Sequence, residues 1–215
     1  TLLSKSTVTN VVSDSLKTLT IDGGQALTIS SALTNTTIDA SASTGAVNLT
    51  LGANAAHVVK GGSGADTIDA VGTLTSTDTL TGGAGSDVLF GGWGNDILSG
   101  LMRDAAGSET DDTDFLNGGG GKDSIVAGSG DIVTAGAGND EIVLGDWLSS
   151  GDAAQIMNYA AEDDSIVLVW DDSSSASVEP QITLNTEPNV DDQTLVMLNG
   201  TLVATVNGTD LLPSD

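Results

Sequence analysis

The stretch GGAGSDVLFGGWGNDILS, residues Gly82–Ser99, consists of two consecutive copies of a nine-residue unit. The unit reads G-G-x-G-x-D-x-U-x, where U is apolar, and it recurs in full at Gly61–Asp69 (GGSGADTID) and Gly118–Val126 (GGGGKDSIV). Weaker copies follow at Ala127–Thr134 and Ala135–Val143. Four full copies within 215 residues indicate a repeat protein, in which each unit covers the apolar face of its neighbours.

The last residues of each unit have the alternating pattern of a short β-strand. The apolar residue then points to one face and its two neighbours point to the other. This alternation predicts one inner face made of Ile68, Leu80, Leu89, Leu98, Leu116, Ile125, Val133 and Ile142. It also places Phe90, Ile97, Phe115 and Ile132 outside, and Trp93 is expected to be exposed at a variable loop position. A neighbouring segment or a second molecule can contact these residues.

The spacing of the aspartates tests whether the units keep one register. Several pairs lie nine residues apart, among them Asp87 and Asp96. Asp96 and Asp114 lie eighteen residues apart, which is two units, so the segment Gly100–Asn117 is predicted to contain one complete coil. Its surviving half is the D-x-U-x sequence Asp114–Asn117.

Each unit supplies the oxygen ligands that calcium prefers. Ca²⁺ takes about six to eight oxygens in a tolerant geometry, and carboxylate and backbone carbonyl oxygens serve well. We expect the glycines at positions 1, 2 and 4 to take positive φ and to turn carbonyl oxygens towards a common centre. The aspartate at position 6 adds a short, charged ligand.

With these units the chain resembles the RTX (repeat-in-toxin, haemolysin-type) calcium-binding family. The resemblance implies an all-β, right-handed parallel β-roll, or β-helix solenoid, of about eighteen residues per coil. It also implies that several Ca²⁺ ions lie between the loops of successive coils. The implied carboxylate ligands are Asp66, Asp87, Asp96, Asp123 and Asp140, with Asp78, Asp114 and Asp131 as weaker candidates whose loops depart from the pattern. The implied loop glycines are Gly61, Gly64, Gly82, Gly83, Gly85, Gly91, Gly92, Gly94, Gly118, Gly119, Gly121, Gly128, Gly136 and Gly138.

A flexible linker is the alternative reading of a glycine-rich segment, because such composition usually remains solvated. A linker does not require an apolar residue two places after each aspartate. The regular pattern therefore favours a folded roll.

Composition limits the classes of protein that fit. Hydrophobic residues make up 39% and aromatic residues only 3%, which suits a column of small stacked aliphatic side chains better than a conventional core. Thirty acidic residues against five basic ones give a formal charge of −25, so we expect calcium binding and folding to be coupled. Nucleic acid is excluded as a partner because little here neutralises phosphates. An anionic membrane is an equally poor target unless calcium bridges the two surfaces.

The sequence contains no cysteine, so calcium is expected to supply the stapling that disulfides often give to extracellular proteins. It contains no apolar run of about twenty residues, so no transmembrane segment is predicted. It begins at Thr1 without a methionine or a signal peptide, and we expect it to be part of a longer polypeptide.

Residues 1–60 are predicted to form solenoid coils without clear calcium loops, ahead of a calcium-binding roll at 61–144. Ile21, Ile29, Ile38 and Val47 lie eight to nine residues apart, which matches the later period. This part resembles the repeat-rich regions of calcium-dependent bacterial surface-layer (S-layer) proteins and large RTX adhesins. A Thr-rich β-sandwich is the alternative.

Residues 145–215 are predicted to form a C-terminal cap. We expect a short helix near Asp152–Ala161, then strands at Asp164–Trp170, Ile182–Leu184, Thr194–Leu198 and Leu202–Val206, with a two-residue hairpin turn at Asn199–Gly200. The ending LNGTLVATVNGTDLLPSD resembles the capping and secretion region of type I-secreted RTX proteins. A separately functioning domain is the alternative.

No catalytic motif accompanies these features. His57 is the only histidine, and its surroundings predict a strand residue rather than a ligand or a base. The sequence has no G-x-S-x-G and no H-E-x-x-H. We therefore expect a non-enzyme, although a catalytic β-helix that acts on polysaccharides remains open by analogy of fold, and an enzymatic domain can precede such a module.

Two functions follow as hypotheses. The first is a calcium-dependent extracellular structural protein, S-layer or adhesin-like, on the surface of a Gram-negative bacterium. It would leave the cell through type I secretion machinery, fold on calcium and associate with itself or a cell-surface partner. The second is the non-catalytic secretion and folding module of a secreted hydrolase or toxin.

Overall fold

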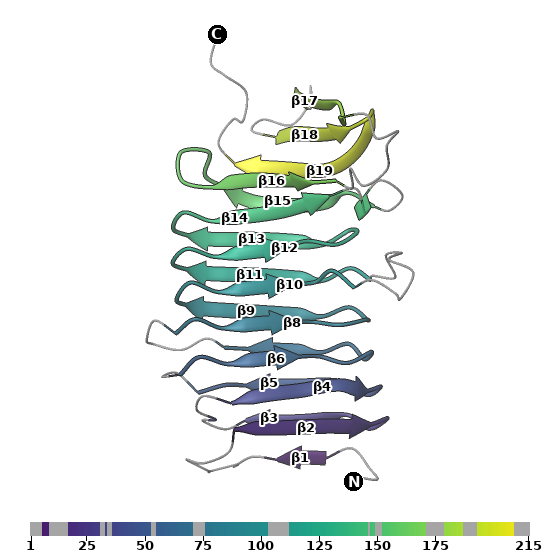
Figure 1. Ribbon diagram of the computed structural model, residues 1–215, viewed down its shortest axis with the longest axis vertical. Coiled ribbons are helices and arrows are strands. Elements are labelled where there is room, and N and C mark those ends of the chain that lie inside the picture. Colours follow the sequence, from purple (N-terminus) through teal and green to yellow (C-terminus); the bar gives the residue numbers. More distant parts are fainter. Residues whose placement is uncertain are drawn as a thin grey trace.

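The computed structural model describes residues 6–8, 17–30, 33, 36–52, 55–70, 76–102, 112–145, 147–148, 152–170, 179–186 and 193–208. Those residues form nineteen β-strands and no α-helix. The strands stack one above another from the N-terminal to the C-terminal end of an elongated molecule (Figure 1). The predicted all-β class is confirmed.

Two sheets run along the stack, and each coil contributes one strand to each sheet. Sheet 1 begins with β1 (Ser6–Val8), β3 (Leu27–Ser30), β5 (Val47–Thr50), β7 (Thr67–Asp69), β9 (Val88–Trp93), β11 (Phe115–Gly120), β13 (Ile132–Ala137) and β15 (Ala154–Tyr159). Sheet 2 contains β2 (Thr18–Gly23), β4 (Thr37–Ser43), β6 (Val58–Lys60), β8 (Thr79–Thr81), β10 (Ile97–Ser99), β12 (Ser124–Val126), β14 (Glu141–Gly145) and β16 (Ser165–Val169). All neighbouring strands among these sixteen pair in parallel, so the predicted parallel solenoid is confirmed.

The core is the column of aliphatic side chains between the two sheets. Its central residues are fully buried, and they are the predicted inner face: Ile68, Leu80, Leu89, Leu98, Leu116, Ile125, Val133 and Ile142. Register explains the column, because Leu98 pairs directly with Leu80 on one side and with Ile125 on the other. Like side chains therefore stack on like from coil to coil.

The solenoid begins well before the first glycine-rich unit. Ile21, Ile29, Ile38 and Val47 are all buried, on alternating sheets, and their strands pair in parallel. The β-sandwich alternative is therefore wrong. The same two sheets continue past residues 60 and 144. The predicted boundaries at these residues therefore separate types of repeat within one solenoid, and they remain a prediction.

The helix expected at Asp152–Ala161 is wrong, because this segment contains β15. Strand β15 pairs with β13 on one side and with β19 (Thr201–Gly208) on the other. The hydrogen bonds of these two strand pairings outweigh the helix propensity of Ala, Gln and Met. Ala154, Ile156 and Tyr159 are buried. The pairing of β15 with β19 shifts register between Ile156 and Tyr159, where Asn158 has a φ of 56°.

The complete coil expected in Gly100–Asn117 is also wrong. Strand β9 pairs with β11, and β10 pairs with β12, so the chain makes only half a coil between β10 and β11. The additional residues belong to the connection, of which 103–111 lie outside the described residues. An insertion as long as one unit reproduced the spacing of a repeat without adding a strand between β9 and β11 or between β10 and β12.

Three strands extend sheet 1 at its C-terminal end. Strand β19 lies parallel to β15, whereas β18 (Gln193–Leu198) and β17 (Ile182–Thr186) add to it antiparallel. Asn199 and Gly200 have φ of 53° and 83°, as a two-residue hairpin of this kind requires. The three strands predicted in residues 182–206 and the hairpin are thus confirmed.

The column makes a direct prediction for adjacent residues of β10. Replacing Leu98 by Ala removes a side chain with no exposed surface and should lower the free energy of unfolding by about 2–5 kcal/mol. Replacing Ile97, which is 47% exposed on the outer face, should cost less than about 1 kcal/mol. Denaturant unfolding in saturating calcium measures both, and equal losses would contradict the assignment of inner and outer faces.

Candidate metal centres at the edges of the solenoid

Aspartates occupy the turns at both edges of the solenoid, each immediately before a strand. The first aspartate ladder precedes strands of sheet 1 and consists of Asp66, Asp87, Asp114 and Asp131. The second precedes strands of sheet 2 and consists of Asp78, Asp96, Asp123, Asp140 and Asp164. All nine are buried. Because units nine residues apart alternate between the edges, a given carboxylate faces the one a full coil away.

Within each ladder, a carboxylate Oδ1 accepts a hydrogen bond from the backbone N–H of the aspartate one coil earlier. In the second ladder the Asp78 N–H donates to Asp96 at 2.7 Å, and the Asp96 N–H donates to Asp123 at 2.8 Å. The first ladder repeats this bond between Asp66 and Asp87 at 2.7 Å. The other rungs are Asp87 to Asp114, Asp114 to Asp131, Asp123 to Asp140 and Asp140 to Asp164. One oxygen of each carboxylate is therefore fixed between coils.

The second oxygen of four carboxylates is buried and accepts no hydrogen bond from the protein. These atoms are the Oδ2 atoms of Asp87, Asp96, Asp123 and Asp140. A buried charged oxygen without a partner carries a large desolvation cost, which a bound cation removes. The ends of the first ladder differ, because Oδ2 of Asp66 and Asp131 accept from the N–H of Gly62 at 2.7 Å and Gly128 at 2.6 Å.

Backbone carbonyl oxygens converge on the same places. A Cβ added to Gly91 would lie 2.7 Å from Asp96 Oδ2 and 2.6 Å from the carbonyl oxygen of Gly118 in the next coil. A Cβ added to Gly118 would lie 2.5 Å from both Asp123 Oδ2 and the Ala135 carbonyl oxygen. The first glycine of a unit therefore leaves a small space lined by a carboxylate and a carbonyl oxygen, which suits a hard cation such as Ca²⁺.

The glycines divide into two roles, which corrects the expectation that all three take positive φ. In the full units from Gly82 onwards, positions 2 and 4 do so, as at Gly92 (97°) and Gly94 (144°), whereas Gly62 and Gly64 of the first unit do not. The same holds for Gly83, Gly85, Gly119, Gly121, Gly136 and Gly138. The position 1 glycines Gly61, Gly82, Gly91 and Gly118 do not have positive φ. Position 1 requires glycine because a side chain would meet the carboxylate oxygen.

Electrostatics at the edges favours a bound cation. Burial, together with neighbouring carboxylates, raises the pKa of Asp87 and Asp123 to about 7 and that of Asp96 to about 6, although backbone hydrogen bonds oppose the shift. Burial also raises the pKa of Asp66 and Asp140. A divalent cation and protons therefore compete for the same oxygens.

The ladders contain every aspartate that the sequence marked as a candidate ligand. Among the described residues no three His, Cys, Asp or Glu side chains converge on one point, because each rung combines few carboxylates with backbone oxygens. Sequence reasoning missed Asp164 as a rung. Its signal was the D-x-U pattern of Asp164–Ile166, although the 24 residues from Asp140 hid it.

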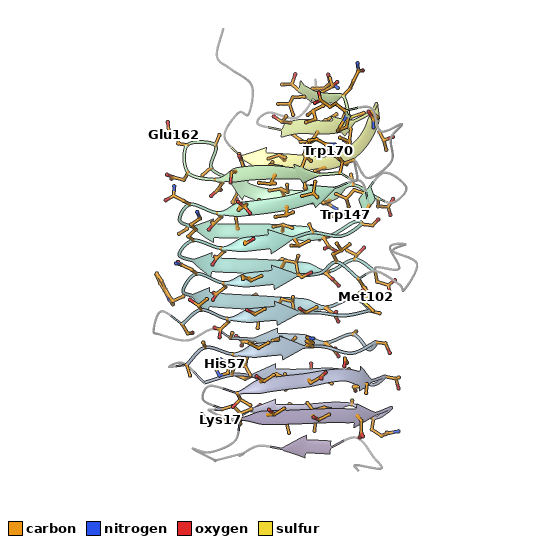
Figure 2. The ribbon with its side chains drawn as sticks, viewed as in Figure 1. Lys17, His57, Met102, Trp147, Glu162 and Trp170 are labelled. Carbon is orange, nitrogen blue, oxygen red and sulfur yellow. The ribbon has the colours of Figure 1, made fainter. Side chains whose placement is uncertain are left out.

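His57 lies at the N-terminal end of the second ladder, directly before β6 (Figure 2). Its ring is buried between Asp78 and the Leu33 carbonyl oxygen. Burial lowers the pKa of His57, but the hydrogen bonds to Asp78 and Leu33 outweigh it and raise the pKa above its ordinary value. The expectation of a strand residue is wrong, because His57 lies in the turn immediately before β6, and the pairing with Asp78 was not predicted.

Comparison with protein families gives one finding. A family model described as the RTX calcium-binding nonapeptide repeat, in four copies, matches residues 58–70, 74–101, 110–142 and 131–146. These matches cover the ladders from Asp66 to Asp140. Comparisons with curated proteins and with solved structures return no match.

The site predicts that single rungs control calcium-driven folding. Replacing Asp96 or Asp123 by Ala removes a buried ligand oxygen and an inter-coil hydrogen bond, so the calcium concentration at the folding midpoint should rise severalfold or more. Circular dichroism during a calcium titration measures it. Asp22→Ala, at an exposed residue of β2, makes the same change in charge and should leave the midpoint near that of the wild type.

The raised pKa values predict opposite pH effects with and without calcium. The metal-free folded state holds protons on Asp87, Asp96 and Asp123 up to pH 6–7, whereas the unfolded chain loses them near 3.8. Stability without calcium should therefore fall as pH rises from 5 to 8, while calcium affinity should increase over the same range. Thermal unfolding in calcium-free buffer and calcium titrations at each pH test this; a calcium midpoint independent of pH would contradict it.

Proposed function

We propose that this chain, whose residues 58–146 match the RTX calcium-binding nonapeptide repeat, is a structural part of an extracellular surface protein that folds when calcium binds. The observation that carries the proposal is the continuous solenoid, in which calcium-type loops form only the middle part of a longer stack. We assign the ions to the carboxylates Asp87, Asp96, Asp123 and Asp140 with carbonyl oxygens of the glycine loops. The other predicted carboxylate ligands, Asp66, Asp78, Asp114 and Asp131, belong to the same two aspartate ladders.

Charge explains why folding depends on the ion. The chain carries a formal charge of −25, and the roll gathers carboxylates in rows along both edges. Without a cation these groups must be protonated or must repel one another, which keeps the chain open at neutral pH. Calcium neutralises them and satisfies their buried oxygens, so binding energy becomes folding energy.

The difference in calcium concentration between the inside and the outside of the cell would determine where the chain folds. A chain that stays open at low intracellular calcium is suited to export through type I secretion machinery. Millimolar calcium outside lies in the range that extracellular calcium modules use, so the roll would fold there and stiffen. We place the mature protein outside a Gram-negative bacterium on this basis.

The outer faces support association with another surface. Trp93 is 58% exposed, and the outward rings of Phe90 and Phe115 contact each other with centroids 5.8 Å apart. Such residues on the outer face of a parallel sheet offer a contact for a second copy or a cell-surface partner. The described residues contain no helix long and apolar enough to cross a membrane.

We also propose that the chain is not an enzyme. Its one histidine is held by Asp78 and the Leu33 carbonyl oxygen, and the sequence has no cysteine. The buried acids are accounted for by the calcium ladders. The alternative, a secretion and folding module of a secreted hydrolase or toxin, requires the same ladders. The coils β2–β5, which lie ahead of the matched calcium-binding repeats, favour the structural role.

A calcium titration followed by circular dichroism and light scattering tests the function. Calcium should produce strand signal and, afterwards, growing assemblies, whereas magnesium at equal concentration should not, because it rarely accepts such an all-protein oxygen cage. Trp93→Ala should keep the folding midpoint and reduce assembly. A folded, strictly monomeric wild type would favour the secretion module, and the absence of any calcium-induced folding would refute both hypotheses.

A further inference from the structure

His57 occupies the aspartate position of its coil. Val58 pairs with Thr79, which places His57 beside Asp78, in the same way that the pairing of Thr79 with Ile97 places Asp78 beside Asp96. The backbone N–H of His57 donates to Asp78 Oδ1 at 2.6 Å. In the same way, the backbone N–H of Asp78 donates to Asp96 Oδ1. The histidine is therefore the first member of the second ladder, with an imidazole in place of a carboxylate.

The imidazole bridges two coils. Its Nδ1 lies 3.1 Å from Asp78 Oδ1, and its Nε2 lies 2.8 Å from the carbonyl oxygen of Leu33. Both neighbours are hydrogen-bond acceptors, so both bonds are made only when each ring nitrogen carries a proton. In that form the ring carries a positive charge beside the carboxylate.

Asp78 differs from the aspartates after it. Its Oδ1 accepts from His57, and its Oδ2 accepts from the Ser76 hydroxyl at 3.0 Å. Oδ2 of Asp96, Asp123 and Asp140 has no such donor. The unit that contains Asp78 also lacks the glycines that bring carbonyl oxygens together in the units after it.

We propose that His57 takes the place of a calcium ion at the Asp78 rung, so that calcium binding at this edge begins with Asp96. The imidazole supplies the hydrogen-bond donors and charge that an ion supplies in later rungs. It also ties the calcium-bound coils to the calcium-free coils through Leu33. His57 is a positioning residue in this role, and the inference stands on the contacts of the rung whichever surface function the protein has.

Ion counting tests which rungs bind calcium. Equilibrium dialysis with radioactive calcium gives the number of ions per folded chain for the wild type, Asp78→Asn and Asp96→Asn. We expect Asp78→Asn to bind as many ions as the wild type and Asp96→Asn to bind at least one fewer. Loss of an ion in Asp78→Asn would overturn the proposal.

Hydrogen exchange tests the link between the two parts of the solenoid. In calcium-loaded His57→Ala, amides within residues 17–52 should exchange at least about tenfold faster than in the wild type, while those within 112–145 should be unchanged. Val58→Ala alters the adjacent exposed side chain, which faces away from the ladder, and should behave like the wild type.

If the amides of residues 17–52 in His57→Ala exchanged at the wild-type rate, His57 would not couple the two parts of the solenoid. If Asp96→Asn also bound as many ions as the wild type, Asp96 would not be a calcium ligand. The later rungs would then hold no ion whose place His57 could take, and the proposal would fail. Neither result depends on assembly or on secretion.

Discussion

The rest of the structure depends on the hydrogen bond that joins each aspartate to the next coil. A backbone N–H reaches the carboxylate Oδ1 of the aspartate one coil later, and the strand residue after that aspartate returns a bond to the earlier carbonyl, as Ile97 does to Asp78. This pair of bonds fixes the carboxylate inside the edge and leaves its second oxygen for a cation. Turn geometry, sheet register and metal binding are consequently set by the same contact.

Stability comes from two sources that complement each other. The column of fully buried leucine, isoleucine and valine side chains holds the two sheets together. It does nothing for the acidic edges, where burial alone is unfavourable. With few aromatic residues and no cysteine to compensate, the acidic edges are therefore where protonation or a bound cation contributes most to stability.

Much of the fold and of the candidate site followed from the sequence, because the repeat links chemistry to position. Residues such as Leu89 and Ile125 were placed on the inner face by period alone, and the aspartates before their strands were identified with them. The errors have a common cause, which is that spacing does not report topology. An insertion before Asp114 had the length of a unit, and the long connection between β14 and β15 hid the relation of Asp164 to Asp140. The strand at 154–159 and the bridge at His57 depend on neighbours from other coils, which no local pattern reveals.

The aspartate ladder also gives the stack a polarity. In every rung the acceptor belongs to the later residue, and the last acceptor, Asp164, is already held within its own loop by the Ala160 N–H at 2.9 Å. Each coil of the second ladder therefore depends on the coil at its C-terminal side for the acceptor of its aspartate N–H. Loss of the Asp164 carboxylate would leave the N–H of Asp140 without this acceptor.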